Sequence, residues 1–415
     1  MKISESKKGY LMLATMWLAY VTFAMNWVAG SSLTPQITME FFGGPVDPLI
    51  SQVVNYSITT ARVFANVLAA LVLVKLGPKK AAGTAIGLLL FCIVAVYLPN
   101  YWAYTAARMV MAVGGSMVIV YMNPVVANYI TNSKTKLRIN AANTVSYNVG
   151  AFIVAVLFTL FADQLVADWQ NTLTVFASLT LVFFVAWLVV AEDFETGSSN
   201  AVAAKDGEKI EEYGYREALR DGFLWRYGMG FAAFLCLYVM TLVNLKPIFD
   251  QYTLLNGSVT ALLISGFGIL GTFAGIWIGN KGFQRRPTLI LAGLGMTLSF
   301  IVAIYFANSI PMLSYVLIAL SGFIMFIQYP LYLNFAHELP KMYPQKLTVM
   351  FGLFWAMGYG GFTIFQIIWS YILGEYGYQP SMIFWGVTIL FYVGLVATFP
   401  ETRPKAMPKS GTKAA

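Results

Sequence analysis

Charged side chains are scarce in this sequence, and their scarcity excludes most soluble architectures. Asp, Glu, Lys and Arg make up only 11% of the 415 residues, whereas soluble domains carry roughly 25%. Apolar residues make up 59%, and the mean hydropathy is +0.69. We therefore predict a bundle of long membrane helices rather than a set of soluble domains.

Histidine, cysteine and catalytic motifs are also nearly absent. The single histidine, His337, stands beside Glu338 at the end of an apolar run, which favours a hydrogen bond at the membrane rim over a proton relay. Cys92 and Cys236 both lie inside apolar runs, where packing is the expected role. The sequence has no metal-ligand cluster, catalytic triad or phosphate loop, so we expect neither an enzyme nor a bound cofactor.

What the chain does have is a series of apolar runs of about 20 residues, each long enough to cross a bilayer. A hydrophilic segment separates the first six runs from the last six. We therefore predict an all-α integral membrane protein with an N-terminal half (1–191), a cytoplasmic linker (192–222) and a C-terminal half (223–415) that ends in a short cytoplasmic tail. The twelve predicted spans are residues 10–31, 49–75, 79–98, 101–130, 138–162, 170–191, 223–249, 256–280, 287–307, 311–336, 346–373 and 379–399.

The distribution of Lys and Arg predicts the orientation. If both termini are cytoplasmic, every cytoplasmic connection carries Lys or Arg, and the opposite connections carry none. This positive-inside pattern indicates a multi-pass protein of the plasma (inner) membrane with both termini in the cytoplasm. The net charge of +8 thus reflects topology, so we expect the lipid bilayer and no nucleic acid as a partner. Nothing in the sequence calls for an oligomer, and we expect a monomer.

Two basic turns occupy corresponding places in the halves. Lys75-Leu-Gly-Pro-Lys-Lys80 follows the second run, and Lys281-Gly-Phe-Gln-Arg-Arg286 follows the eighth. In the fourth run, Arg108-Met-Val-Met-Ala-Val-Gly-Gly115 is similar to an Arg-x-x-x-Gly-x-Gly pattern. With the twelve spans and the central linker, these motifs make the chain resemble a transporter of the major facilitator superfamily.

The resemblance implies two six-helix halves that rock about a site at the membrane midplane, with the basic turns acting as cytoplasmic gating motifs. The chain departs from the family's turn, because Val74 stands where an acid is expected and Asn280 lies near that place in the second copy. The predicted gating residues are Lys75, Gly77, Lys79, Lys80, Lys281, Arg285 and Arg286.

Three positive charges stand inside the predicted membrane helices. The cytoplasmic connections, the span ends next to them and the termini hold all of the 26 Lys and Arg except Arg62, Arg108 and Lys246, and none of the 18 acids lies in a helix middle. A charge at the bilayer centre costs at least a few kcal/mol, and buried charges need a counter-ion. We therefore expect the substrate to be an anion. For Arg108 the resemblance leaves a conformational or proton-transfer role open, and Lys246 can instead snorkel to the interface.

Arg62 belongs to a polar face. Asn55, Thr59, Arg62 and Asn66 follow i, i+4, i+7, i+11 spacing, which places them on one side of a helix. Polar and aromatic groups of other cavity-lining helices complete the predicted site. The predicted substrate-binding residues are Arg62, Arg108, Asn66, Thr59, Asn26, Tyr147, Asn143, Tyr238, Asn244, Tyr329, Tyr332 and Tyr359, with Lys246 as an accessory charge.

These residues predict a secondary active transporter for a small anion. A midplane carboxylate or histidine that could titrate is missing, and arginine keeps its proton, which favours exchange or facilitated passage. Guanidinium suits carboxylates, phosphates and planar oxyanions, and the aromatic residues favour a carboxylate. The alternatives are a proton-coupled symporter, a drug or sugar carrier with structural arginines, and, from another class, a non-transporting membrane sensor, which would need more output surface than the linker and tails offer.

Overall fold

The fold is a bundle of long helices. We describe it from a computed structural model over residues 5–130, 133–194, 213–340, 342 and 344–403. Every regular element in these ranges is helical, which confirms the predicted all-α class. Residues 195–212 of the predicted linker and residues 404–415 of the predicted tail lie outside the described ranges.

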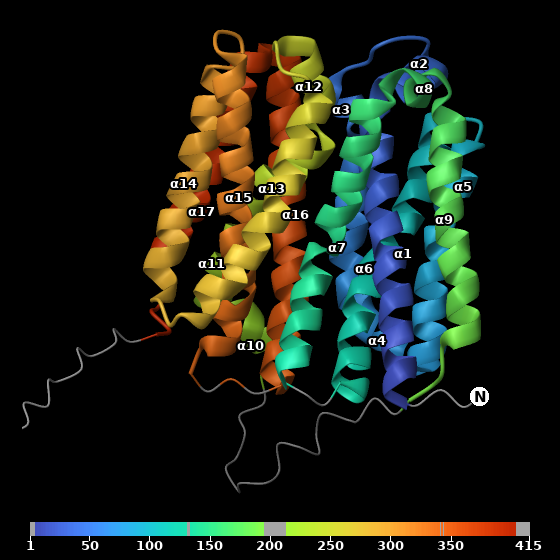
Figure 1. Cartoon of the computed structure of the whole chain (residues 1–415), viewed down its shortest axis with the longest axis vertical. Helices are drawn as coiled ribbons and strands as arrows, with labels where there is room; N and C mark the ends of the chain where they lie inside the picture. The colour runs from blue at the N-terminus through green and yellow to red at the C-terminus, as the bar shows by residue number, and fades with distance from the viewer. Residues whose placement is uncertain (1–4, 131–132, 195–212, 341, 343, 404–415) are drawn as a thin grey trace, which may run out of the picture.

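The helices of the first half stand together on one side of the molecule (Figure 1). Short helices α2, α3 and α8 cover one end of this half, which we call the upper end, as it is drawn in Figure 1. The elements in chain order are α1 (Glu5–Ser32), α2 (Thr34–Phe42), α3 (Pro48–Ser51), α4 (Val53–Leu89), α5 (Phe91–Val96), α6 (Tyr101–Tyr129), α7 (Ser133–Leu160), α8 (Ala162–Ala167) and α9 (Trp169–Val190).

The helices of the second half stand on the other side, with α12 at the upper end and α10 at the opposite, lower end (Figure 1). Helix α13 packs against α7, and α16 packs against α4, so these four helices join the two sides. The elements in chain order are α10 (Tyr215–Arg220), α11 (Gly222–Val243), α12 (Leu245–Tyr252), α13 (Gly257–Asn280), α14 (Arg285–Tyr305), α15 (Pro311–Phe335), η2 (Ala336–Glu338), α16 (Pro344–Tyr376) and α17 (Tyr378–Ala397).

Short polar side chains begin several of these helices. The Asn100 side chain accepts a hydrogen bond from Ala103 N at 2.9 Å, and Asp168 does the same for Asn171 N at 3.0 Å. In the second half, the side chain of Asp221 accepts from Phe223 N at 2.9 Å, at the start of α11. Each cap satisfies a backbone donor that the first helical turn leaves unpaired. At the starts of these three helices, a polar residue therefore marks the boundary of the apolar span.

Helix α4 contains the first basic turn. Its regular geometry is interrupted at Gly77, whose φ of 75° and ψ of 162° lie in a region that glycine adopts readily, and Pro78 follows. The kink divides α4 into the predicted second and third spans. Eleven helical segments of the described chain are long and apolar enough to cross a membrane. Together with the arm of α4 that precedes Gly77, they form the predicted twelve-helix architecture.

The predicted span 223–249 is not one helix. Helix α11 ends at Val243, and α12 starts at Leu245 after Asn244. Pro247 explains the break, because a proline nitrogen cannot donate to the carbonyl of Val243 four residues earlier. Helix α1 is interrupted in a similar place, where α2 follows Leu33 with Pro35 in its first turn. Each of these two helices is therefore followed by a separate short helix, α2 or α12, at the upper end of the bundle (Figure 1).

Candidate substrate site

Arg62 lies in a box of aromatic rings between the two sides of the molecule. Its side chain is 2% exposed. The Nη2 atom donates a hydrogen bond to Tyr20 Oη at 3.0 Å. The guanidinium carbon lies 4.4 Å from the ring centroid of Tyr359, 5.4 Å from that of Phe23 and 5.6 Å from that of Trp27. Aromatic faces attract cations, but they do not neutralise the charge. None of the described carboxylates pairs with Arg62.

Several polar atoms in and beside this box have no hydrogen-bond partner among the described residues. They are Nε and Nη1 of Arg62 and the hydroxyls of Tyr147 and Tyr238, all of them buried. The Tyr147 ring lies 5.5 Å from that of Trp27 and 5.8 Å from that of Tyr238, and the Tyr238 ring lies 5.9 Å from that of Tyr329. Buried polar groups are normally hydrogen-bonded. This cluster, which spans α1, α4, α7, α11 and α15, is therefore suited to a polar ligand.

Above the box, hydrogen-bonded amide side chains join the two sides. We call Gln52, Asn55, Asn244 and Gln366 the amide clasp. Gln52 Oε1 accepts from Asn55 Nδ2 at 2.7 Å and from Asn244 Nδ2 at 2.6 Å. Asn244 Oδ1 accepts from Gln366 Nε2 at 3.1 Å. All four side chains are buried, so the clasp closes the upper side of the Arg62 box.

Two further hydrogen bonds lie near the clasp and the box, and the first of them connects the two. Trp27 Nε1 donates to Asn55 Oδ1 at 2.9 Å, which orients the indole that faces Arg62. One turn before Arg62, Thr59 Oγ1 accepts a hydrogen bond from Thr363 Oγ1 at 2.7 Å. The predicted residues Thr59 and Asn244 therefore lie in the contact between the two sides of the molecule.

Arg108 occupies separate surroundings. Its Nη2 donates to the backbone carbonyl of Asn26 at 2.6 Å, and its guanidinium carbon lies 5.9 Å from the Tyr104 ring centroid. A Cβ atom on Gly30 would lie 2.5 Å from Nη2, so a larger residue at this position would force the end of the Arg108 side chain to shift. None of these residues belongs to the Arg62 box. The structure therefore does not bring the two predicted arginines together.

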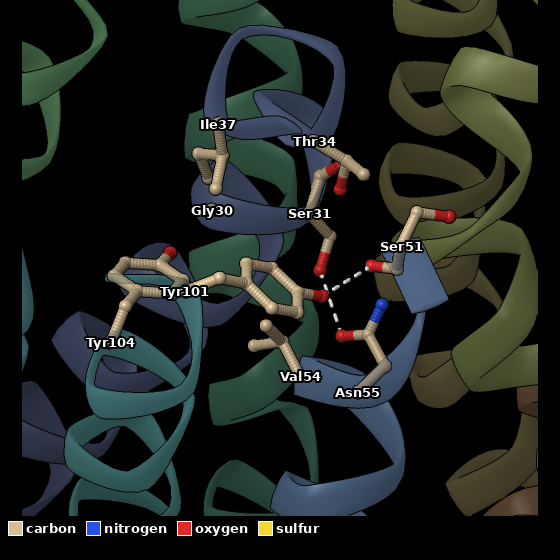
Figure 2. Close-up of a pocket in the computed structure, with 9 residues that line it drawn as sticks. All are labelled: Gly30, Ser31, Thr34, Ile37, Ser51, Val54, Asn55, Tyr101 and Tyr104. Carbon is tan, nitrogen blue, oxygen red and sulfur yellow. Dashed lines mark hydrogen bonds between the residues drawn. The ribbon is translucent and has the colours of Figure 1, made fainter. Parts of the chain in front are cut away.

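A small cavity lies beside Arg108, between α1, α4 and α6 (Figure 2). Figure 2 shows Tyr101 donating to Ser51, with an O–O distance of 3.0 Å, and Ser31 donating to Asn55 at 3.0 Å. The cavity volume is about 10 Å³, close to the space that one water molecule needs. An organic substrate does not fit there. The lining residues are Gly30, Ser31, Thr34, Ile37, Ser51, Val54, Asn55, Tyr101 and Tyr104.

Lys246 has an acidic partner, which corrects the expectation that none of the three embedded cations has one. Its Nζ lies 3.1 Å from Asp250 Oδ2 on the next turn of α12. The other Asp250 oxygen accepts from Gly257 N at 2.7 Å and so fastens α12 to the start of α13. The i, i+4 spacing of the pair in the sequence is the signal that predicts it. An accessory role for Lys246 at the Arg62 box is therefore not supported by its contacts.

The remaining predicted residues are spread along the same helices. Tyr332 is bonded to Tyr227, since each hydroxyl donates to the other residue's carbonyl, at 2.6 and 2.8 Å. The side chain of Asn26 donates to the carbonyls of Thr22 and Phe176, at 2.8 and 3.3 Å. Asn143 lies one turn before Tyr147 on α7, and Asn66 is half-buried one turn after Arg62 on α4. Along their own helices, Asn26, Asn143 and Asn66 adjoin residues of the box or its hydroxyl cluster, but the Asn26 side chain donates to the two carbonyls named above.

A family model described as Major Facilitator Superfamily matches residues 16–354. The chain belongs to the major facilitator superfamily. An uncharacterized protein of Mesomycoplasma hyopneumoniae (strain J) is 26% identical over 412 residues, which cover 89% of this chain and 84% of that protein. A second uncharacterized protein, from Campylobacter jejuni, is 22% identical over 193 residues, which cover 45% of this chain and 57% of that one.

Solved transporters share the fold. The inward-open structure of the xylose transporter XylE from E. coli has a TM-score of 0.73 and 13% identity, over 96% of this chain and 98% of that one. A mutant of the nucleoside transporter NupG has a TM-score of 0.63 and 13% identity, over 93% of this chain and 98% of that one. Identities this low establish the fold alone. Family and fold make this chain a membrane transporter rather than an enzyme.

The first basic turn of this superfamily member receives its acid from a distant segment. Asp193 follows α9, and its Oδ1 accepts from Lys79 N at 3.0 Å; it would lie 3.2 Å from a Cβ atom at Gly77. Next to it, Glu192 accepts from Lys8 Nζ at 2.5 Å and from Tyr129 Oη at 2.8 Å, and these hydrogen bonds, with Lys8 first, lower the pKa of Glu192. Asp193 thus supplies the turn with an acid in place of the one missing at Val74, and Glu192 joins the ends of α1 and α6 beside it.

The second basic turn is arranged in the same way. Arg285 donates to Glu338 from Nε, at 2.8 Å and 3.1 Å to the two oxygens, and from Nη2 at 2.6 Å. Arg403 Nη2 donates to Glu338 at 2.7 Å. Glu401, which follows α17, accepts from the backbone nitrogens of Arg285 and Arg286 at 2.8 and 3.1 Å. Glu338, Glu401 and Arg403 were not predicted to belong to this turn, because they are distant from it in sequence.

Proposed function

We propose that this transporter moves a small organic anion, specifically a carboxylate, across the plasma (inner) membrane by alternating access, as an exchanger or a facilitator. The observation that carries the proposal is Arg62. It is a buried guanidinium with two nitrogen atoms that lack a partner, and no described acid pairs with it. A buried charge of this kind calls for a counter-ion, and in a transporter the counter-ion that can come and go is the substrate.

Carboxylate oxygens match the unpaired donors of Arg62 better than a neutral ligand does. Charge-assisted hydrogen bonds from guanidinium to carboxylate are shorter and about twice as strong as neutral ones. The rings of Phe23, Trp27 and Tyr359 suit the organic part of such a molecule. An inorganic oxyanion would use the same donors but would leave the aromatic walls without a partner.

Exchange follows from the permanent charge of arginine. Arginine does not lose its proton in proteins, so the empty site keeps its positive charge. Reorienting the empty carrier would move this uncompensated charge through the membrane interior, which is unfavourable. With an anion bound, the site is neutral and the halves can rock. We therefore infer that loaded carriers reorient faster than empty ones, as an exchanger requires.

The proposed orientation places the upper end outside the cell and the lower end, with both basic turns, in the cytoplasm. The reason is the asymmetry of Lys and Arg between the connections. In this orientation, the amide clasp lies on the outer side of Arg62. One chain supplies every residue of the box and the clasp, so a monomer suffices.

The competing functions remain a proton-coupled symporter and a drug or sugar carrier. One structural relative is described as a D-xylose–proton symporter, which is a statement about that protein. In either carrier, Arg62 would be structural. Uptake by a symporter would require a proton gradient, and uptake by a drug or sugar carrier would not depend on the charge of the substrate. A non-transporting sensor would catalyse no flux at all.

Counterflow in proteoliposomes tests the proposal. Vesicles loaded with an unlabelled carboxylate should accumulate the labelled compound after the proton gradient is collapsed. We expect Arg62→Gln to lower this flux at least about tenfold, because a charged hydrogen bond contributes about 1.5–3 kcal/mol. Arg216→Gln, at an exposed position of α10, is the matched control and should leave the flux unchanged. Flux that stops when the proton gradient is collapsed, or that persists in Arg62→Gln, contradicts the proposal.

A further inference from the structure

The contacts of the three embedded cations leave one positive charge in the box. Asp250 pairs with Lys246 at 3.1 Å, and Arg108 donates to the Asn26 carbonyl away from the box. Arg62 alone faces the aromatic rings, and the described part of the box contributes no negative charge. The site therefore offers one unit of charge to a ligand.

This count limits the charge of the substrate. A monoanion leaves the loaded site neutral. A dianion would bring a second negative charge into a buried site that has no second cation to pair with it. A neutral molecule would leave the charge of Arg62 uncompensated. Both cases carry the large cost of a buried unpaired charge. Monoanions are therefore preferred over dianions and over neutral analogues of the same shape.

A second element of recognition lies beside the guanidinium. The hydroxyls of Tyr147 and Tyr238 are buried and lack partners among the described residues, and their rings are 5.8 Å apart. The Tyr147 ring lies 5.5 Å from the Trp27 ring, and the Trp27 ring centroid lies 5.6 Å from the guanidinium carbon of Arg62. A phenol both donates and accepts hydrogen bonds, so the pair can hold an oxygen that is either a hydroxyl or a carbonyl.

The box restricts where this second oxygen can stand. Phe23 and Trp27 are each 1% exposed, and the Tyr359 ring packs directly on the guanidinium. In the binding mode that we infer, the carboxylate of a short ligand meets Arg62, and its next oxygen meets Tyr147, whose ring lies beside Trp27. Formate or nitrate would neutralise Arg62 but would leave the hydroxyls of Tyr147 and Tyr238 without a hydrogen-bond partner.

We propose that the substrate is a small monocarboxylate with a hydroxyl or oxo group on the carbon next to the carboxylate. The carboxylate binds Arg62, and the neighbouring oxygen binds the hydroxyls of Tyr147 and Tyr238. This inference rests on the proposed function, since it names the anion class for the same site. Sites built to hydrogen-bond a hydroxyl reject the analogue that lacks it much more strongly than apolar pockets reject a missing methylene.

A thermal-shift titration of the purified full-length protein with matched three-carbon compounds tests the class. The probes are L-lactate, D-lactate and pyruvate, with propionate, malonate, lactamide, formate and nitrate for comparison. We expect lactate, in at least one enantiomer, or pyruvate to stabilise the protein at concentrations at least about tenfold below those of propionate, formate and nitrate. Malonate and lactamide should give no shift.

Variants connect the preference to the two tyrosines. Tyr147→Phe and Tyr238→Phe should each reduce the preference for lactate or pyruvate over propionate, and should leave the response to propionate unchanged. Tyr392→Phe removes another buried hydroxyl that lacks a described partner, on α17, and serves as the matched control with an unchanged preference. Size-exclusion chromatography identifies a variant that has not folded, in which case the other tyrosine variant decides.

The outcomes separate the inference from the function on which it rests. Propionate, formate or nitrate could bind as tightly as lactate and pyruvate, or malonate or lactamide could bind more tightly. If Arg62→Gln abolishes that binding, the anion site is supported and the substrate class proposed here is wrong. If the preference for lactate or pyruvate over propionate survives in both tyrosine variants, Tyr147 and Tyr238 do not bind the neighbouring oxygen. If no compound raises the melting temperature of the protein, or if the rise persists in Arg62→Gln, the proposed function itself is wrong.

Discussion

The guanidinium of Arg62 in α4 lies 4.4 Å from the ring centroid of Tyr359 in α16, so the buried cation of one half is covered by a ring of the other. The contact joins the two helices that pack against each other between the halves. A desolvated cation–π contact contributes about 2 kcal/mol. Arg62 is therefore sensitive to the relative position of the two halves, as a substrate-binding residue of a rocking carrier must be.

Replacing the ring tests this contact. Tyr359→Leu should lower the free energy of unfolding by about 1–2 kcal/mol, whereas Tyr359→Phe, which keeps the ring face, should stay close to wild type. Tyr371→Leu is the matched control, because Tyr371 lies on the same helix and is 47% exposed. The measurement is thermal unfolding in detergent. Equal losses of unfolding free energy in Tyr359→Leu and Tyr371→Leu would show that the Tyr359 ring does not stabilise Arg62.

The amide clasp should govern opening of the proposed outer side. Asn244→Leu removes two hydrogen bonds of the clasp, one of which crosses between the halves, so the closed state should lose about 1–2 kcal/mol. A cysteine introduced by Thr59→Cys should then react roughly tenfold faster with an impermeant maleimide added from outside.

Asn308→Leu provides the control for the clasp, because Asn308 also accepts a hydrogen bond near the upper end, but from Leu254 within its own half. This variant should leave the Thr59→Cys reaction rate unchanged. The native Cys92 and Cys236 are both buried, so their background reaction is small. An unchanged rate in Asn244→Leu would mean that the clasp does not hold the outer side closed.

Glu338 should contribute more to the free energy of unfolding than any other described acid at the lower end. It bonds Arg285, which is 3% exposed, and Arg403, which is 30% exposed. Glu338→Gln leaves a buried arginine without its counter-ion, so the free energy of unfolding should fall by about 3–5 kcal/mol. Arg403→Gln should cost less, and Glu375→Gln, at an exposed position, should cost nothing measurable. A double-mutant cycle of Arg285 with Glu338 that shows no coupling would contradict the assignment.

The pair of Lys8 and Glu192 should make stability depend on pH. Hydrogen bonds from Lys8 and then Tyr129 lower the pKa of Glu192, so the folded state binds a proton less readily than the unfolded state. Its contribution is complete above the unfolded pKa and is lost as the pH falls through the folded pKa. The difference in melting temperature between wild type and Glu192→Gln should therefore shrink as the solution is acidified below the usual glutamate range.

The size of this pH effect should be modest. The side chains of Lys8 and Glu192 are 37% and 32% exposed, so water and salt screen the pair. Raising the salt concentration at neutral pH should reduce the same difference. A difference in melting temperature that grows on acidification would contradict the sign argued here.

The sequence predicted the helical architecture well, because apolar runs and basic turns are local signals. It did not predict which residues meet across the bundle. Asp193 and Glu338 replace the acids missing near Val74 and Asn280, but they come from segments far away in the chain. Periodicity along α4 showed that Arg62 and Thr59 share a face, and could not show that α16 supplies Tyr359 and Thr363 to it.

The candidate site was predicted in part for the same reason. Residue type and placement in the predicted helices selected Arg62, Tyr147, Tyr238 and Tyr359, whereas the contacts of Tyr20, Phe23 and Trp27 with Arg62 became evident only when α1 was placed beside α4. The Lys246–Asp250 pair was readable from its i, i+4 spacing and was missed. The domain boundaries and the roles assigned to site residues stay predictions.

The most direct test of the central claim is the melting temperature of Arg62→Gln with and without a carboxylate. If Arg62 is an uncompensated cation that awaits an anion, removing its charge should raise the melting temperature of the empty protein and abolish the rise that L-lactate or pyruvate produces in wild type. If Arg62 is structural instead, Arg62→Gln should melt at a lower temperature and keep the ligand-induced rise. That second result would contradict the account.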